Sequence, residues 1–376
     1  MKRMKSVLIV GAVCAGALTM SRSFAQPTPT PSNFVWQPGY LEPGLPKPPY
    51  VPPEVPQGSG PHPAIMVGET IEPGADFVSY YPANLAQLGG KKLPVLVWAN
   101  GSCLYVGNRT RHFLQDIASH DYLVLAGGEL IVGDKAEDAE NIDMSVNLMI
   151  ANPDPPPSAT PGAGRGAGRG AGRGAGSATT QQQFDIQRPA TPTKSVTHDL
   201  LDKGINWVIA ENKRAGSKFF GKLDTANIAV MGTSCGSQVA ASFAGDPRVK
   251  TLGIWNGGFG TIGGNGTPNV SEIRAKLTQP VLNITGDPRY DAAYWGGIKG
   301  FEAMQDAKTP IFYAWRVNMV HMNVFRQTNG GEVAPLTEAW LDWQLKGDQT
   351  AARWFTGPKC GLCTNTHYHV DRLNMN

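Results

Sequence analysis

The chain lacks long apolar runs after its N-terminus, and it has almost no excess of one charge. No later segment reaches the about 18 consecutive apolar residues that a membrane-spanning helix needs. The 33 lysines and arginines nearly balance the 30 aspartates and glutamates, and a net charge of +3 is too small to require an anionic partner. The sequence therefore predicts neither a membrane span nor a nucleic-acid partner.

Cysteine is also scarce, with five among 376 residues. Cys14 lies in the N-terminal segment 1–25, which has a basic head, a short apolar centre and a Ser-Phe-Ala end. This pattern is typical of a secretory signal peptide cleaved after Ala25, and it predicts a secreted or periplasmic protein. An even number of remaining cysteines in an exported chain favours disulfides, and four cysteines allow three pairings. The four are Cys103, Cys235, Cys360 and Cys363.

Composition divides the rest of the chain. Residues 26–63 are crowded with proline and are predicted to be an extended arm or linker before one large domain, 64–376. Inside that domain, 151–193 is rich in glycine, alanine and arginine, and we expect a flexible insertion there. Two other interpretations of this insertion remain: a mobile flap over an active site, and an Arg-Gly segment that binds a polyanion. Residues 348–376 are predicted to be a C-terminal tail with a Cys-x-x-Cys motif.

Unbroken apolar runs alternate with helical patterns along the domain. The predicted helices are 111–119, 196–212 and 335–345. The predicted strands are 65–67, 76–81, 93–99, 122–126, 228–231, 251–255, 281–285 and 310–315. This alternation predicts an α/β fold with a mostly parallel central sheet and helices on both faces.

One glycine-rich turn stands between the strand 228–231 and a helix of small residues. Its sequence is Gly232-Thr233-Ser234-Cys235-Gly236, which matches the G-x-S-x-G pattern of a nucleophile elbow in its required strand, turn and helix context. Such a turn strains the backbone of the serine, so the positions two residues away must be glycine to avoid collisions. Ser234 is therefore the candidate nucleophile.

A nucleophilic serine needs a histidine to remove its proton and a carboxylate to orient that histidine. His321 follows the last predicted strand, and it is the only histidine between Ser234 and the C-terminal tail. Two carboxylates follow the strand 281–285, namely Asp287, which also suits a turn cap, and Asp291 farther out. We expect Asp291 to be the acid and keep Asp287 in reserve.

Acyl transfer also needs donors for the oxyanion that forms. The candidates are the backbone N–H of Cys235 and that of Ser102 or Cys103, in the loop after the strand 93–99. Because Cys103 and Cys235 would then lie on two loops of one pocket, we expect a disulfide between them. The alternative is two buried free thiols.

The Cys-x-x-Cys motif near the C-terminus has two interpretations. We expect Cys360 and Cys363 to form a local disulfide, because export favours oxidation. A zinc site is the alternative, in which His367 and His369 supply the two further ligands.

Together these features resemble the α/β-hydrolase superfamily, in particular exported bacterial serine esterases of the dienelactone hydrolase and cutinase-like type. The resemblance covers 65–345 and is most specific at 98–103, 232–236, 286–294 and His321. It implies an α/β-hydrolase fold for the catalytic domain, and it favours Asp291, which precedes an Ala-Ala-Tyr run. It also implies that Trp255 lines the acyl pocket, with Leu104 or Tyr105 opposite; the alternative for Trp255 is core packing.

The resemblance implies a serine carboxylic-ester hydrolase with a Ser-His-Asp triad, an acyl-enzyme intermediate and no metal or organic cofactor. Small-molecule and polymeric esters both remain open as substrates, and the sequence does not specify an oligomeric state. The same residues would serve an acyltransferase or an amidase. Two rival classes are an exported binding protein that keeps the fold without turnover, and a thiol oxidoreductase that acts through Cys360 and Cys363.

Overall fold

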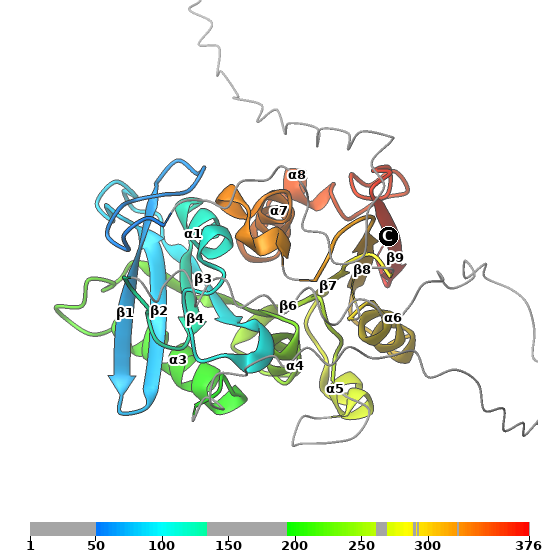
Figure 1. Cartoon of the computed structure of the whole chain (residues 1–376), viewed down its shortest axis with the longest axis horizontal. Helices are drawn as coiled ribbons and strands as arrows, with labels where there is room; N and C mark the ends of the chain where they lie inside the picture. Colours follow the sequence, from blue (N-terminus) through cyan, green and yellow to red (C-terminus); the bar gives the residue numbers. More distant parts are fainter. Residues whose placement is uncertain are drawn as a thin grey trace, which may run out of the picture. The chain divides into compact units, whose positions relative to one another are not determined.

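A computed structural model describes residues 50–133, 194–260, 269–288, 291, 293–321 and 323–375. Within these residues, nine strands form one sheet in the order β1-β2-β4-β3-β5-β6-β7-β8-β9 (Figure 1). The six strands from β4 to β8 in this order run parallel, whereas β1, β2 and β9 are antiparallel to their neighbours. The strands are β1 Ala64–Glu72, β2 Ala75–Pro82, β3 Leu93–Ala99, β4 Leu123–Gly127, β5 Leu223–Thr233, β6 Val249–Trp255, β7 Val281–Thr285, β8 Ile311–Arg316 and β9 Tyr368–Leu373.

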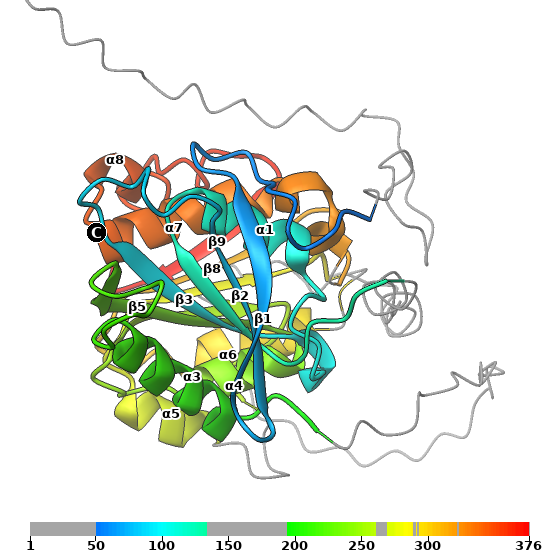
Figure 2. The ribbon, with the colours of Figure 1, turned by 90° about the vertical axis from the view of Figure 1, so that its left-hand side faces the viewer.

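Helices cover both faces of this sheet (Figure 2). On one face lie α1 (Arg111–Ser119), α7 (Val333–Lys346) and α8 (Gln349–Ala352). On the other lie α3 (His198–Glu211), α4 (Cys235–Ala241), α5 (Val270–Lys276) and α6 (Tyr294–Ala303). The predicted α/β class with a mostly parallel sheet is confirmed.

The core is divided by the sheet into two apolar layers. Every residue of β3 is buried, and successive side chains point to opposite faces of a strand. Leu96 and Trp98 thus join the layer under α1 and α7, while Val95 and Val97 join the layer under α3. This double burial explains why the central strands read as unbroken apolar runs.

The predicted N-terminal linker, 26–63, requires a correction. Its described part, 50–63, packs against α1: the Arg111 guanidinium lies 5.5 Å from the centre of the Tyr50 ring and donates to the carbonyl oxygen of Val51 (3.3 Å). The backbone N–H of Ser59 donates to Asp116 Oδ1 (2.6 Å). This part of the chain packs on the domain, because some of its backbone groups bond to α1 and others to β1.

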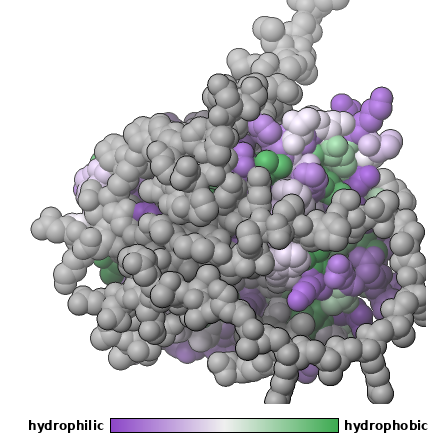
Figure 3. Space-filling model, turned by 45° about the vertical axis from the view of Figure 1, so that its right-hand side comes forward, coloured by the Kyte–Doolittle hydropathy of each residue, from purple (hydrophilic) through white to green (hydrophobic). Residues whose placement is uncertain are grey.

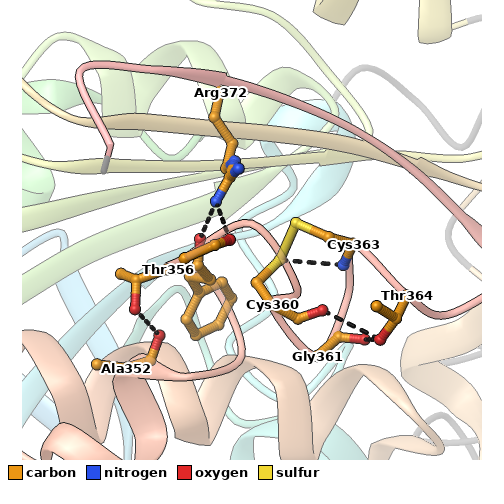
Figure 4. Close-up of a disulfide and its surroundings, with 9 residues drawn as sticks. Ala352, Thr356, Cys360, Gly361, Cys363, Thr364 and Arg372 are labelled. Atoms are coloured by element: carbon orange, nitrogen blue, oxygen red, sulfur yellow. Dashed lines mark hydrogen bonds between the residues drawn. A yellow bond between two sulfur atoms is a disulfide. The ribbon is translucent and has the colours of Figure 1, made fainter.

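The segment 348–376, expected to be the C-terminal tail of the domain, contains α8 and β9, and β9 pairs with β8 as the edge strand of the sheet. Figure 4 shows the turn between them, in which Cys360 and Cys363 form a disulfide with their Cα atoms 4.9 Å apart. Arg372 in β9 donates to the carbonyl oxygens of Phe355 (3.3 Å) and Gly357 (2.8 Å). A zinc site on this motif is excluded in this state, because both sulfurs are consumed by the bond.

Several sequence predictions lie outside the described residues, among them the signal peptide 1–25, most of the arm 26–63, and the insertion 151–193. In the described part of the chain, no helix combines the length and apolar character that crossing a bilayer requires. Large hydrophobic side chains that are exposed there include Val55, Val132 and Phe220. The face drawn in Figure 3 carries hydrophilic and hydrophobic side chains next to one another.

Candidate active site

Ser234 occupies the sharp turn between β5 and α4. Its backbone angles, φ 53° and ψ −121°, lie outside the regions that residues with a side chain normally adopt. A Cβ on Gly232 would collide with the carbonyl oxygen of Gly236, and a Cβ on Gly236 would collide with that of Ala99. The two glycines of the motif are therefore required by close backbone approach, and they allow the strained serine between them.

Hydrogen bonds to the next strand hold this turn in place. The backbone N–H of Ser234 donates to the carbonyl oxygen of Trp255 at the end of β6 (2.8 Å). The carbonyl oxygen of Ser234 accepts from Ser237 Oγ (2.6 Å), which also lies 3.3 Å from the carbonyl oxygen of Gly258. The side chain of the half-buried Ser234 therefore projects from a backbone that is fixed on both sides.

His321 and Asp291 form a buried pair. Nδ1 of His321 lies 2.7 Å from Oδ1 of Asp291, and the two side chains are 5% and 0% exposed. The carboxylate also accepts from Asn256 Nδ2 (2.9 Å), from the Gly286 N–H (2.7 Å) and from the Ala293 N–H (2.9 Å). Burial alone would raise the pKa of Asp291, but the His321 charge and these hydrogen bonds lower it below its usual value. Asp291 is thus an ionised carboxylate at neutral pH, placed to orient the imidazole.

Asp287 contacts the loop after β8 through its backbone and its side chain. Its side chain is fully buried, and its Oδ2 accepts from the backbone N–H of Asn318 (2.8 Å). Its own N–H donates to the carbonyl oxygen of Met319 (2.9 Å). Asp287 therefore ties the loop after β7 to the loop that carries His321. The structure brings Asp291, not the reserve acid Asp287, to the histidine.

The sheet topology gathers these groups. Strands β5, β6, β7 and β8 are consecutive parallel neighbours, so the residues after their carboxyl ends meet at one edge of the sheet. Ser234 follows β5, Asp291 lies in the loop after β7, and His321 lies in the loop after β8. Asn256, directly after β6, is a further residue of this candidate site that the sequence did not single out, and its side chain contacts Asp291. The signal in the sequence was an asparagine directly after a predicted strand, because asparagine tolerates the positive φ (43°) found there.

A second loop meets the serine turn from the side of β3. Ser102 and Cys103 both have positive φ, 55° and 49°. Cys103 is bonded to Cys235 in the pairing that the sequence predicts, with the Cα atoms 5.3 Å apart. The side chain of Asn100 accepts from Trp98 Nε1 (3.0 Å) and donates to the carbonyl oxygen of Val106 (2.7 Å). The disulfide and Asn100 fix the loop that carries the expected oxyanion donors.

Two of the expected substrate-contacting residues are placed elsewhere. Trp255 is fully buried among aromatic rings, with its centroid 6.3 Å from that of Phe113 and 5.6 Å from that of Phe325, so it is a core residue. Tyr105 is also buried, and its hydroxyl accepts from the Asp76 N–H near the start of β2 (2.7 Å). Trp255 ends β6, and the sequence does not reveal which face of the sheet a side chain at a strand end takes; Tyr105 lies in a loop, whose packing the local sequence does not specify. Leu104 is half-buried beside Cys103.

This edge of the sheet combines a strained serine, an imidazole with an ionised carboxylate behind it, and backbone amides held by a disulfide. Such groups are suited to activating a hydroxyl as a nucleophile and to stabilising a developing oxyanion. Neither a scan against protein-family models nor a search of curated proteins finds a match for this chain.

Proposed function

We propose that this protein is an exported serine hydrolase of the α/β-hydrolase superfamily that cleaves carboxylic esters through an acyl-enzyme. The observation that carries this proposal is the buried Asp291–His321 pair (2.7 Å), on the same sheet edge as a serine held at positive φ between two indispensable glycines. The chain order of serine, acid and histidine, each after a later strand, is the order of that superfamily.

In the first half-reaction, Oγ of Ser234 attacks the ester carbonyl carbon while Nε2 of His321 accepts its proton. Asp291 stabilises the resulting imidazolium through Nδ1. The tetrahedral oxyanion accepts hydrogen bonds from the backbone N–H of Cys235 and from that of Ser102 or Cys103. His321 then gives its proton to the leaving alcohol, and the acyl group remains on Ser234.

In the second half-reaction, a water molecule loses a proton to His321 and attacks the acyl carbon. The same donors hold the oxyanion, and the proton passes from His321 to Ser234 as the carboxylic acid leaves. No step in this sequence requires a cofactor. Small-molecule and polymeric esters are both candidate substrates, with Leu104 the remaining wall residue from the sequence prediction.

A fluorophosphonate probe tests the nucleophile directly. Wild-type protein should be labelled once per chain, and Ser234→Ala should not be labelled. Ser242→Ala is the matched control, because Oγ of Ser242 lies 2.8 Å from Nδ1 of His198 in an exposed serine–histidine contact outside the proposed site. Labelling that persists in Ser234→Ala, or is lost in Ser242→Ala, would contradict the assignment.

Hydrolysis of p-nitrophenyl esters of increasing chain length, with feruloyl and polyester substrates alongside, then tests the reaction. We expect turnover of at least one ester class by the wild type and none by Ser234→Ala. Labelling without ester turnover would favour the amidase or acyltransferase alternative. A folded wild-type protein that takes no label would favour a binding protein without catalysis.

A further inference from the structure

A second cluster of titratable side chains lies between α1 and α7, outside the proposed catalytic residues. It consists of Asp116 in α1, His120 directly after α1, and Glu338 in α7, and one ligand atom of each lies within 4.8 Å of the others. Nδ1 of His120 is 2.9 Å from Oε1 of Glu338 and 3.0 Å from the carbonyl oxygen of Asp116. Three groups that commonly bind metal ions therefore converge from two helices.

Glu338 gives an independent indication that this cluster is incomplete. The residue is 7% exposed, and its Oε1 is shielded from solvent with His120 Nδ1 as an ion-pair partner at 2.9 Å, in a geometry that falls short of a regular hydrogen bond. In the described part of the chain, neither Asp116 nor Glu338 forms an ion pair with a lysine or arginine. A protonated His120 would balance only one of these two buried carboxylates, whereas a divalent ion would balance both.

We propose that Asp116, His120 and Glu338 bind one divalent transition-metal ion of the Zn²⁺ type. One imidazole with two carboxylates suits Zn²⁺ better than Ca²⁺ or Mg²⁺, which prefer all-oxygen sites. Ligand atoms about 2.1 Å from a common ion lie at most about 4.2 Å apart, so the observed spacing needs only small side-chain rotations. On binding, His120 is neutral with its proton on Nε2, and Nδ1 donates its lone pair to the ion.

The surroundings of the cluster fit this role. The N–H of Ser59 holds Oδ1 of Asp116 (2.6 Å), which fixes the carboxylate and leaves Oδ2 for the ion. The side chains of His120 and Glu338 are 11% and 10% exposed, so the site reaches the surface at one edge. A bound ion would join 50–63, α1 and α7. The inference concerns stability and does not depend on the proposed esterase activity.

The test is calorimetric titration of Zn²⁺ into full-length protein that has been dialysed against a chelator. Wild type should bind Zn²⁺ at this site, and Glu338→Gln and His120→Asn should each weaken that binding at least tenfold. Asp342→Asn is the matched control, since Asp342 is an acidic residue one turn along α7 that bonds Tyr122 (2.8 Å) and Lys346 (2.9 Å) instead. The control should stay within twofold of wild type.

Unfolding of each variant without metal shows whether it folds, and Glu338→Gln should fold because it keeps the shape and removes a buried charge. Zn²⁺ should raise the melting temperature of wild type and of Asp342→Asn but not of Glu338→Gln. No Zn²⁺ binding by wild type, equal binding by wild type and both cluster variants, or a preference for Ca²⁺ over Zn²⁺ would each overturn the proposal.

Discussion

The two disulfides should contribute very different amounts to the free energy of unfolding. The Cys103–Cys235 bond joins residues 132 positions apart, and the Cys360–Cys363 bond joins residues 3 positions apart. If a disulfide acts mainly by restricting the unfolded chain, the long loop contributes about 5 kcal/mol and the short loop about 2 kcal/mol. The perturbation is to replace each pair by alanine in a separate double variant.

Guanidinium unfolding at pH 7 measures both variants against wild type. Loss of the long-loop bond should lower the free energy of unfolding by about 3 kcal/mol more than loss of the short-loop bond. Cys360 is fully buried, so its replacement also leaves a cavity that costs about 1 kcal/mol. This cost reduces the expected difference between the two variants by the same amount. Equal losses, or a larger loss from the Cys360/Cys363 variant, would refute the argument from loop length.

The same two variants should also differ in catalytic activity. The Cys103–Cys235 bond holds the loop after β3 against the serine turn, so the variant without it should lose at least about tenfold in kcat as the oxyanion donors loosen. The Cys360/Cys363 variant should keep wild-type kcat below its melting temperature. If both variants kept full activity, the disulfide would be a stabilising link without a role in positioning the donors.

Three further predictions follow from the site. Asp291→Asn should lower kcat by about 10⁴ with the protein still folded. Burial is outweighed by the His321 charge and the hydrogen bonds, which lower the pKa of Asp291, so the ionised carboxylate stabilises the folded protein at pH 7. Relative to Asp291→Asn, this contribution to the free energy of unfolding should be lost as the pH falls below about 4. Asn256→Ala should reduce kcat about tenfold with little change in KM, as measured by steady-state kinetics, because the carboxylate loses one orienting donor. Gly236→Ala should destabilise by about 1–3 kcal/mol in chemical unfolding, whereas Gly296→Ala, where a Cβ meets nothing closer than 3.8 Å, should stabilise by about 0.5–1 kcal/mol.

Several elements of the sheet and one helix could be predicted closely from the sequence, whereas the predicted strand 228–231 covers only part of β5. The expected ranges 93–99, 281–285 and 111–119 coincide with β3, β7 and α1. These segments have strong patterns because burial on both sheet faces, or on one helix face, forces apolar residues into them. The position of Ser234 was equally readable, since only glycine fits two residues to either side of it.

Elements that depend on tertiary contacts were missed. The helix α6 contains Gly296, Gly297 and Gly300, which give it low helix propensity. A Cβ at Gly297 would collide with the side chain of Thr285, so the glycine allows the helix to approach β7. Strand β9 alternates polar and apolar residues weakly, and its pairing with β8 defines it. The local sequence does not indicate which strand or helix such an element will pack against.

At the proposed catalytic edge of the sheet, hydrogen bonds connect neighbouring loops to one another. The serine turn bonds to the end of β6 through Trp255, and the residue after Trp255 holds Asp291. Asp287 then connects the loop after β7 to the loop of His321. Each proposed catalytic group is therefore positioned by an adjacent strand, so a displacement of one loop should be transmitted to the next. Two aspartates four residues apart thus make separate contacts: Asp291 bonds the histidine ring, and Asp287 bonds the backbone of the loop that carries it.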